Sequence, residues 1–237
     1  MGGGGTTSGV LWRWRRVTPD DGMLNGAWQS RLADHEIAHA HAVPMTSVRA
    51  SYVAARDVLR SLVAEWSGAT PTGVQLLRTP LGAPYLPEHQ SAGCSLSHAG
   101  EVVIAALRPL GPVGIDVELL TRPLADFGAL LRIACTDAER IAIEARPPAE
   151  QRERFLTAWT GKEAVLKALG VGLSVDPRDV AIEEVDEAGH TAVARRLMPD
   201  QGLRAPTADT WHLHRIREIV DHVATIALPA CETPRHG

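Results

Sequence analysis

The strongest structural pattern in the sequence is a helix, which is predicted over residues 152–169. Its apolar side chains recur at the spacing of one buried helical stripe. Gly170 and Gly172 follow directly, and glycine commonly ends a helix. Because short segments with the period of strands lie on both sides of this helix, the chain is predicted to have a mixed α/β (α+β) fold.

Further elements are predicted from the same two periodicities. Strands are predicted over residues 10–17, 94–98, 102–107, 114–119, 179–183, 191–197, 211–217 and 222–227. Helices are predicted over residues 32–42, 48–66 and 136–145. The third helix should begin with a capping box, in which Thr136 is the N-cap and Glu139 bonds back to it.

The chain is expected to contain three segments. Residues 1–9 are glycine-rich and polar, and they are predicted to be disordered. Residues 10–110 and 111–237 are expected to form an N-terminal and a C-terminal half, with the metal-binding motifs in the second half. A faint similarity between residues 56–60 and 162–167 is compatible with two related halves.

Composition limits the classes of function. The net charge of −4 gives no basic field for nucleic acid, so no nucleic-acid partner is expected. No stretch approaches the roughly 20 apolar residues of a membrane span, and the N-terminus lacks the apolar run of a signal peptide. Three scattered cysteines without a CxxC pair suit neither a disulfide framework nor a zinc site. We therefore expect a cytoplasmic protein without a membrane partner.

Two acidic residues alternate along the predicted strand at residues 114–119. Side chains two apart share a strand face, so Ile115 and Val117 are predicted to point to the core. Asp116 and Glu118 then share the other face, with Cα atoms roughly 7 Å apart. Two neighbouring carboxylates repel unless a cation lies between them, and magnesium typically takes one or two carboxylates plus substrate phosphates. The alternative is an ordinary solvated strand face.

The predicted helix at residues 152–169 carries a second group of polar candidates. Trp159, Glu163 and Lys167 are spaced i, i+4 and i+8 and lie along one side. Lys162 falls inside the apolar stripe, where an ammonium must snorkel or meet a carboxylate. Lys162 and Lys167 are the only lysines in the chain, and a compact ammonium suits a phosphate site. The alternative is a surface Glu–Lys pair worth about 0.2–0.5 kcal/mol.

Two further candidates lie in the N-terminal half. Ser97 and His98 stand at the end of a predicted strand, where a small residue and a histidine suit phosphate contact. A structural histidine is the alternative. Arg49 lies at the start of the long helix predicted over residues 48–66, and a surface arginine is its alternative.

Together these segments resemble the 4′-phosphopantetheinyl transferases of the surfactin-synthetase-activating type. The resemblance rests on Ser97-His98, on Gly114-Ile115-Asp116-Val117-Glu118, and on the pattern FxxxWTxKEAxxKAxGxGL that begins at Phe155. It extends more weakly over residues 11–226. The resemblance implies two similar α/β halves with an active-site cleft between them.

The resemblance also implies an activity and a metal site. The chain would transfer the 4′-phosphopantetheine group from coenzyme A to a serine of an apo acyl- or peptidyl-carrier protein, with release of 3′,5′-ADP. Asp116, Glu118 and Glu163 would bind Mg²⁺ on the coenzyme A pyrophosphate. Glu163 would also take the serine proton. Such an enzyme would serve polyketide or nonribosomal peptide biosynthesis, and we expect it to be a monomer.

The remaining site residues receive roles from the same resemblance. Lys167 would neutralise phosphate charge, and Lys162 would orient Glu163 or a phosphate. Ser97 and His98 would contact coenzyme A, His98 through a phosphate. Arg49 would hold the 3′-phosphate of the ribose. The chain departs from its relatives at His39, His41 and Ala83, which stand where basic residues are frequent, and Arg78 is the candidate to compensate for them.

Two other functions are compatible with parts of this pattern. One is a carrier-protein binding module that has lost catalysis, but a pure binder has no need of the Asp/Glu/Glu/Lys set. The other is a magnesium enzyme that acts on a different nucleotide. The sequence contains neither a P-loop nor a GxGxxG fingerprint to support it.

Overall fold

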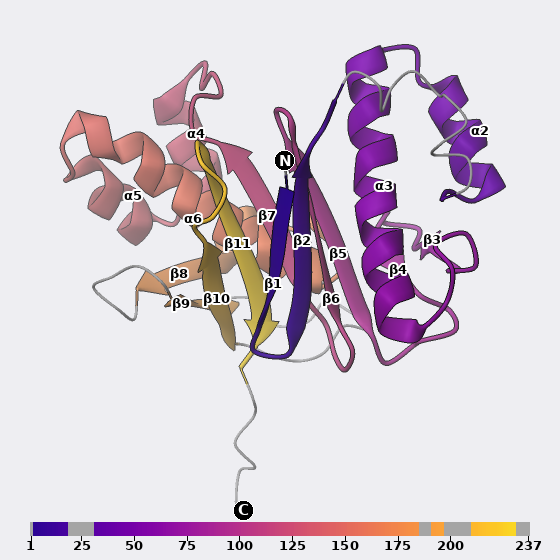
Figure 1. Ribbon diagram of the computed structural model, residues 1–237. Helices are drawn as coiled ribbons and strands as arrows, with labels where there is room; N and C mark the ends of the chain where they lie inside the picture. The colour runs from indigo at the N-terminus through magenta and orange to yellow at the C-terminus, as the bar shows by residue number, and fades with distance from the viewer. Residues whose placement is uncertain (1, 19–30, 185–190, 197–209, 231–237) are drawn as a thin grey trace, which may run out of the picture. The chain divides into compact units, whose positions relative to one another are not determined.

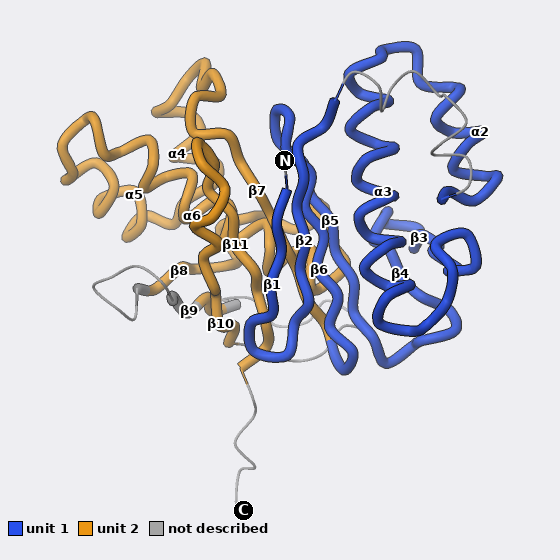
Figure 2. Tube along the Cα trace, viewed as in Figure 1, with its two compact units in different colours: residues 1–111 blue, residues 112–237 orange. Residues whose placement is uncertain are grey.

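The computed structural model describes residues 2–18, 31–184, 191–196 and 210–230 (Figure 1). The chain divides into two compact units, residues 1–111 and 112–237, and Figure 2 colours them separately. Each unit has its own antiparallel sheet and its own long helix. The predicted mixed α/β class is therefore confirmed.

Unit 1 contains a four-stranded sheet with the strand order β1-β2-β6-β5. Its strands are β1 (Gly2–Thr7), β2 (Val10–Arg16), β5 (Gly93–Ala99) and β6 (Val102–Arg108). Two short strands, β3 (Leu77–Arg78) and β4 (Pro84–Tyr85), pair separately. The helices are α2 (Asp34–Ala42) and α3 (Thr46–Ser67), and α3 packs against β2, β5 and β6 (Figure 1).

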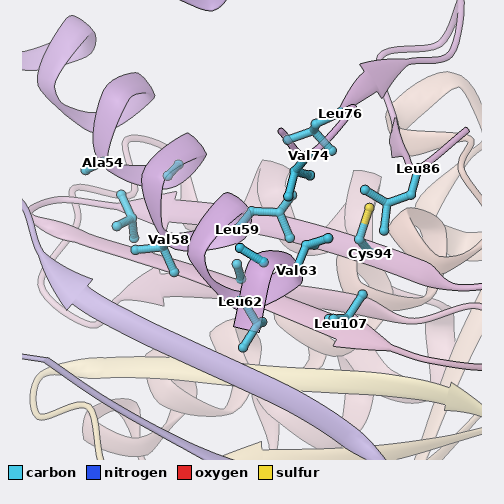
Figure 3. Close-up of a cluster of buried hydrophobic side chains, with 14 residues drawn as sticks. Ala54, Val58, Leu59, Leu62, Val63, Val74, Leu76, Leu86, Cys94 and Leu107 are labelled. Carbon is cyan, nitrogen blue, oxygen red and sulfur yellow. The ribbon is translucent and has the colours of Figure 1, made fainter. Parts of the chain in front are cut away.

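The core of unit 1 forms between α3 and its sheet. Figure 3 shows apolar side chains of α3 directed toward those of the strands and of the segment that connects them. Leu59 and Leu107 are fully buried in this cluster. Burying a side chain of this size stabilises the fold by about 1.5–3 kcal/mol. The helix ends at Gly68, whose φ of 75° lies in the left-handed region that favours glycine.

The glycine-rich N-terminus differs from the prediction, because Gly2–Thr7 form strand β1 rather than a disordered segment. This strand pairs with β2, which places Gly3 opposite Trp14 and Gly5 opposite Trp12. A Cβ at Gly5 would lie only 3.1 Å from the Trp12 ring, so the indole covers the glycine backbone. Cross-strand aromatic cover of this kind compensates for the low strand propensity of glycine. Met1 lies outside the described residues.

Unit 2 contains a five-stranded sheet with the order β7-β11-β10-β9-β8. Its strands are β7 (Gly114–Leu119), β8 (Val180–Glu184), β9 (Thr191–Arg196), β10 (Thr210–Ile216) and β11 (His222–Pro229). Its helices are α4 (Phe127–Ala134), α5 (Asp137–Glu144) and α6 (Pro148–Ala168), followed by single 3₁₀ turns at Gly172–Ser174 and Pro177–Asp179. Helix α4 was not predicted, and α6 begins earlier than predicted, with Pro148 in its first turn.

Gly114 allows α6 to lie directly on β7. A Cβ at this position would lie 1.7 Å from the carbonyl oxygen of Ala164, so no other residue fits without moving the helix. Alternate residues of a strand share a face, so the side chains of Asp116 and Glu118 project on the same side as α6. Asp116 is consequently buried, at 5% exposure, rather than solvated. The helix and the strand thus bring the two acidic motifs together.

The two cysteines among the described residues, Cys94 and Cys135, are both buried. Burial raises the pKa of Cys94 to about 12 and that of Cys135 to about 11, so neither is a thiolate at neutral pH. Cys231 lies outside the described residues. No helix within the described ranges combines the length and apolarity required to cross a membrane.

Candidate active site

The best-defined polar group of unit 2 lies where α6 crosses β7. Lys167 of α6 donates to Oδ1 of Asp116 on β7, with a distance of 2.6 Å between nitrogen and oxygen. The Lys167 side chain is 26% exposed, whereas that of Asp116 is 7% exposed. The ammonium therefore neutralises a buried carboxylate while it keeps contact with solvent.

Glu118 is held by two donors on the same side of β7. The indole Nε1 of Trp159 donates to Glu118 Oε1 at 3.0 Å, and the Arg122 guanidinium pairs with the same oxygen. The predicted helix face thus reaches both acidic residues of β7, because Trp159 contacts Glu118 and Lys167 contacts Asp116. Trp159 and Lys167, at positions i and i+8 of α6, therefore contact two residues of β7 that are two positions apart.

Glu163 is the member of the group whose charge is least compensated. Burial and the nearby charge of Asp116 raise the pKa of Glu163 from its usual 4.5 to about 7, and Lys167 partly opposes this shift. Among the described residues, its Oε1 atom is buried without a hydrogen-bond partner. A buried carboxylate oxygen without a partner is costly, so a bound cation or a proton would stabilise this side chain.

The three predicted metal ligands offer suitable donors but are not gathered around one point. Over the described ranges, no three His, Cys, Asp or Glu side chains converge closely enough to hold a metal ion. Lys167 and Arg122 are instead paired with Asp116 and Glu118. Carboxylate oxygens are the ligands that Mg²⁺ prefers, and Glu163 has an oxygen to offer. The chemistry of the donor set therefore fits the cation.

Lys162 is buried and makes three polar contacts. Its ammonium is 2.8 Å from Glu139 Oε2 and 3.1 Å from the carbonyl oxygen of Pro177, and it also donates to Val180 O. These three acceptors belong to α5, to the 3₁₀ turn Pro177–Asp179 and to β8. The ammonium within the apolar stripe thus meets a carboxylate, one of the two outcomes expected of it, and this carboxylate belongs to another helix. That Lys162 orients Glu163 or a phosphate stays a prediction.

The three candidates of unit 1 differ in how far their side chains are exposed. His98 on β5 is exposed, whereas Ser97 is buried, and consecutive strand residues point to opposite faces. Arg49 donates from Nε to the carbonyl oxygen of Val43 at 3.0 Å and from Nη2 to that of Pro44 at 3.4 Å. Part of the Arg49 guanidinium therefore satisfies carbonyl groups that follow α2.

Unit 1 also contains a basic cavity of about 270 Å³ that the sequence motifs did not reveal. Its lining includes His39 of α2, Arg56 of α3 and Arg78 of β3, and also the carboxylate of Glu36, which lies 3.8 Å from Arg56 and is itself paired with Arg60. Arg56 and Arg78 lie 5.5 and 6.0 Å from the centre of the Tyr52 ring. Burial and the charge of Arg78 lower the pKa of Arg56, so an anion would stabilise this pocket. In the sequence, the i, i+4 spacing of Tyr52 and Arg56 indicates that these two side chains lie on the same face of α3.

Comparison with known proteins points to one class. A family model described as the 4′-phosphopantetheinyl transferase superfamily matches residues 112–227. The 4′-phosphopantetheinyl transferase HetI of Nostoc sp. is 27% identical over 221 residues, which cover 92% of this chain and 86% of that protein. The 4′-phosphopantetheinyl transferase AcpT of Salmonella typhimurium is 30% identical over 149 residues, which cover 63% of this chain and 72% of that protein.

The fold and these similarities define a transferase. The chain belongs to the 4′-phosphopantetheinyl transferase superfamily. The predicted family and its transfer of phosphopantetheine from coenzyme A to carrier proteins are thereby confirmed. A 4′-phosphopantetheinyl transferase of Bacillus subtilis is 26% identical over 136 residues, which cover 57% of this chain and 58% of that protein.

Proposed function

We propose that this chain is a magnesium-dependent 4′-phosphopantetheinyl transferase of the surfactin-synthetase-activating type. It moves the 4′-phosphopantetheine group of coenzyme A to a serine of an apo acyl- or peptidyl-carrier protein and releases 3′,5′-ADP. The observation that carries this proposal is the polar group on β7 and α6, where Lys167 contacts Asp116 beside the buried carboxylate of Glu163.

Asp116, Glu118 and Glu163 would hold the cation. When bound, Mg²⁺ supplies charge neutralisation on the pyrophosphate oxygens. Lys167 pairs with Asp116, and because its side chain is partly exposed, its ammonium could also pair with a phosphate oxygen of coenzyme A.

Glu163 also suits the proton transfer. A general base must be deprotonated before it reacts. Burial raises the pKa of the metal-free Glu163 carboxyl to about 7, and a neighbouring cation would lower it, so the carboxylate would be present at neutral pH. The Glu163 oxygen that does not hold the cation would accept the serine proton, directly or through a water molecule. The serine oxygen then attacks the phosphorus that carries the pantetheine arm, and the bond to 3′,5′-ADP breaks.

Unit 1 would supply binding energy for coenzyme A. Arg49, Ser97 and His98 are the residues proposed from the sequence. The cavity lined by His39, Arg56 and Arg78 has the charge and size for a phosphate monoester, such as the 3′-phosphate of the ribose. Two arginines there would compensate for the neutral histidine that stands in place of a more basic residue. We further propose that the enzyme works as a cytoplasmic monomer.

Mass spectrometry of a carrier protein tests the proposed function. The purified chain is incubated with coenzyme A, Mg²⁺ and an apo acyl- or peptidyl-carrier protein, and the intact mass of the carrier is followed. We expect a gain of one phosphopantetheine group that requires Mg²⁺ and the target serine. A carrier panel that binds the chain but shows no gain in mass would contradict transferase activity and support the binding-module alternative.

A further inference from the structure

Lys162 is a buried charge that the proposed transfer reaction does not use. Its side chain is 1% exposed, and its three bonds go to Glu139, Pro177 and Val180. An ammonium removed from water in this way requires complete pairing, because an isolated buried charge is very costly. Its contacts therefore show what it holds in place: α5, the turn at Pro177–Asp179 and the start of β8.

Glu139 completes this connection from the opposite side. Its Oε2 atom accepts from the Thr136 backbone N–H at 2.7 Å, which forms the predicted capping box, and from Lys162. Its Oε1 atom accepts from the Ile182 backbone N–H at 2.8 Å. One carboxylate thus caps α5, neutralises the lysine of α6 and binds the backbone of β8.

The segment that this pair fixes leads back to the carboxylates of β7. Residues 173–178 line a cavity of about 480 Å³ together with α4, α6 and Arg122. Trp159 of α6 also lines this cavity, and its indole N–H donates to Glu118. Arg122 pairs with the same Glu118 oxygen. The walls of the cavity therefore include both side chains that orient Glu118.

We propose that Lys162 and Glu139 act as a pair of positioning residues for Glu118. By holding Pro177 and Val180 against α6, they fix the cavity wall at residues 173–178, and this cavity is also lined by Trp159 and Arg122, the two side chains that bind Glu118. This inference rests on the proposed function, because it gives Glu118 the role of a magnesium ligand. If Lys162 acted directly on Glu163, its substitution would be coupled to that of Glu163. The proposal instead predicts that it is coupled to the substitution of Glu139.

A set of matched variants tests this proposal. Lys162→Met removes the ammonium and keeps the approximate length of the side chain, whereas Glu139→Gln removes the charge and keeps one acceptor oxygen, so that one of the two backbone N–H groups loses its acceptor. The double variant has no unpaired buried charge. Arg140→Gln on α5 is the control, because Arg140 makes only exposed pairs with Asp137 and Glu144 among the ion pairs of the described residues.

Three measurements are made on each variant: urea unfolding of the metal-free protein, Mg²⁺ binding by calorimetry in the presence of coenzyme A, and kcat. Lys162→Met should lower the unfolding midpoint strongly, and the double variant should regain part of this loss, since the remaining buried group is neutral but leaves one backbone N–H without its acceptor. The double variant should still bind Mg²⁺ about tenfold more weakly and lose about tenfold in kcat, as expected for residues that orient a metal ligand. The control should match the native protein in all three.

The results separate the proposal from a purely structural role. A double variant with native stability, native Mg²⁺ affinity and native kcat would overturn it. Strong coupling of Lys162→Met to Glu163→Gln, with additive effects toward Glu139→Gln, would overturn it as well. If the native protein transferred nothing, the proposed function would fail. The Lys162–Glu139 coupling in unfolding and Mg²⁺ affinity would still decide whether the pair positions Glu118.

Discussion

Helix α6 carries two lysines that each contact a carboxylate, and their surroundings differ sharply. The Lys167 side chain is 26% exposed beside Asp116, whereas the Lys162 side chain is 1% exposed beside Glu139. A partly exposed ion pair can exchange its partners at low cost, because water replaces the lost contact. A buried pair cannot do so, since removing one partner costs about 3–5 kcal/mol. Lys167 thus belongs to the proposed active site, whereas Lys162 stabilises the packing of α6 against its neighbours.

Loss of Asp116 should have the largest effect on transfer. Asp116→Ala removes a proposed metal ligand and the partner of Lys167, so kcat/KM should fall on the order of a thousandfold while the circular dichroism spectrum stays native. Asp137→Asn is a suitable control, because the Asp137 side chain is 94% exposed. An Asp116→Ala variant with near-native turnover would remove this residue from the site.

Loss of Lys167 should have the next largest effect. Lys167→Ala removes an ammonium that meets phosphate charge in the transition state, so kcat should fall about a hundredfold. Lys167→Arg should recover part of this loss, because a planar guanidinium does not replace a compact point charge. Steady-state kinetics at saturating substrates measure both. Full activity of Lys167→Arg would show that any cation serves.

The arginines of unit 1 should affect binding of coenzyme A rather than turnover. Arg78→Ala should raise the KM of coenzyme A about tenfold, since a charge-assisted contact to phosphate contributes about 1.5–3 kcal/mol. Arg49→Ala should raise it less, because part of the Arg49 guanidinium is already bonded to Val43 and Pro44. With 3′-dephospho-coenzyme A, neither variant should change KM. An equal increase for both donors would show that these arginines do not recognise the 3′-phosphate.

The smallest of the expected effects is the one that Glu163 has on the stability of the metal-free protein. Its pKa is raised from 4.5 to about 7 by burial, so the folded state holds its proton to higher pH than the unfolded chain does. Stability contributed by this group is therefore present below pH 4.5 and is lost as the pH rises to about 7. Glu163→Gln should remove this loss and raise the melting temperature at pH 8 by about 2–4 °C.

Magnesium provides the matching comparison for that variant. Added Mg²⁺ should raise the melting temperature of the native protein, because binding to the folded state stabilises it. It should do so much less for Glu163→Gln, which offers a weaker ligand. Equal stabilisation of both proteins would place the cation elsewhere.

The sequence predicted those parts of the molecule that depend on local periodicity. Strand β7 has the predicted bounds, and the capping box of Thr136 and Glu139 is present as predicted. The capping box depends on contacts within a few residues, and the strand was recognised from the alternation of its side chains, although its hydrogen-bonded neighbour is the distant strand β11. Strand β1 was missed because its four glycines are poor strand formers, and the indoles that cover them come from β2.

The site was predictable only where one element decides it. The i, i+4, i+8 spacing correctly placed Trp159 and Lys167 on the side of the β7 carboxylates. The partner of Lys162 was not predictable, because Glu139 lies on another helix and reaches α6 through tertiary packing. Arg78 was a candidate from the sequence, but its place in one cavity with Arg56 was not predictable for the same reason, since α3 and β3 each contribute one arginine.

The most direct test of the contrast between the two lysines is to make one identical substitution at both. Lys167→Met and Lys162→Met are compared by the melting temperature of the metal-free protein and by kcat for transfer to the carrier protein. The account predicts that Lys167→Met loses about a hundredfold in kcat with a smaller fall in melting temperature than Lys162→Met, because Lys167 itself is partly exposed in the native protein. It predicts that Lys162→Met loses about 3–5 kcal/mol of stability, which appears as a much lower melting temperature. Equal changes in melting temperature for the two variants, or full turnover by Lys167→Met, would contradict it.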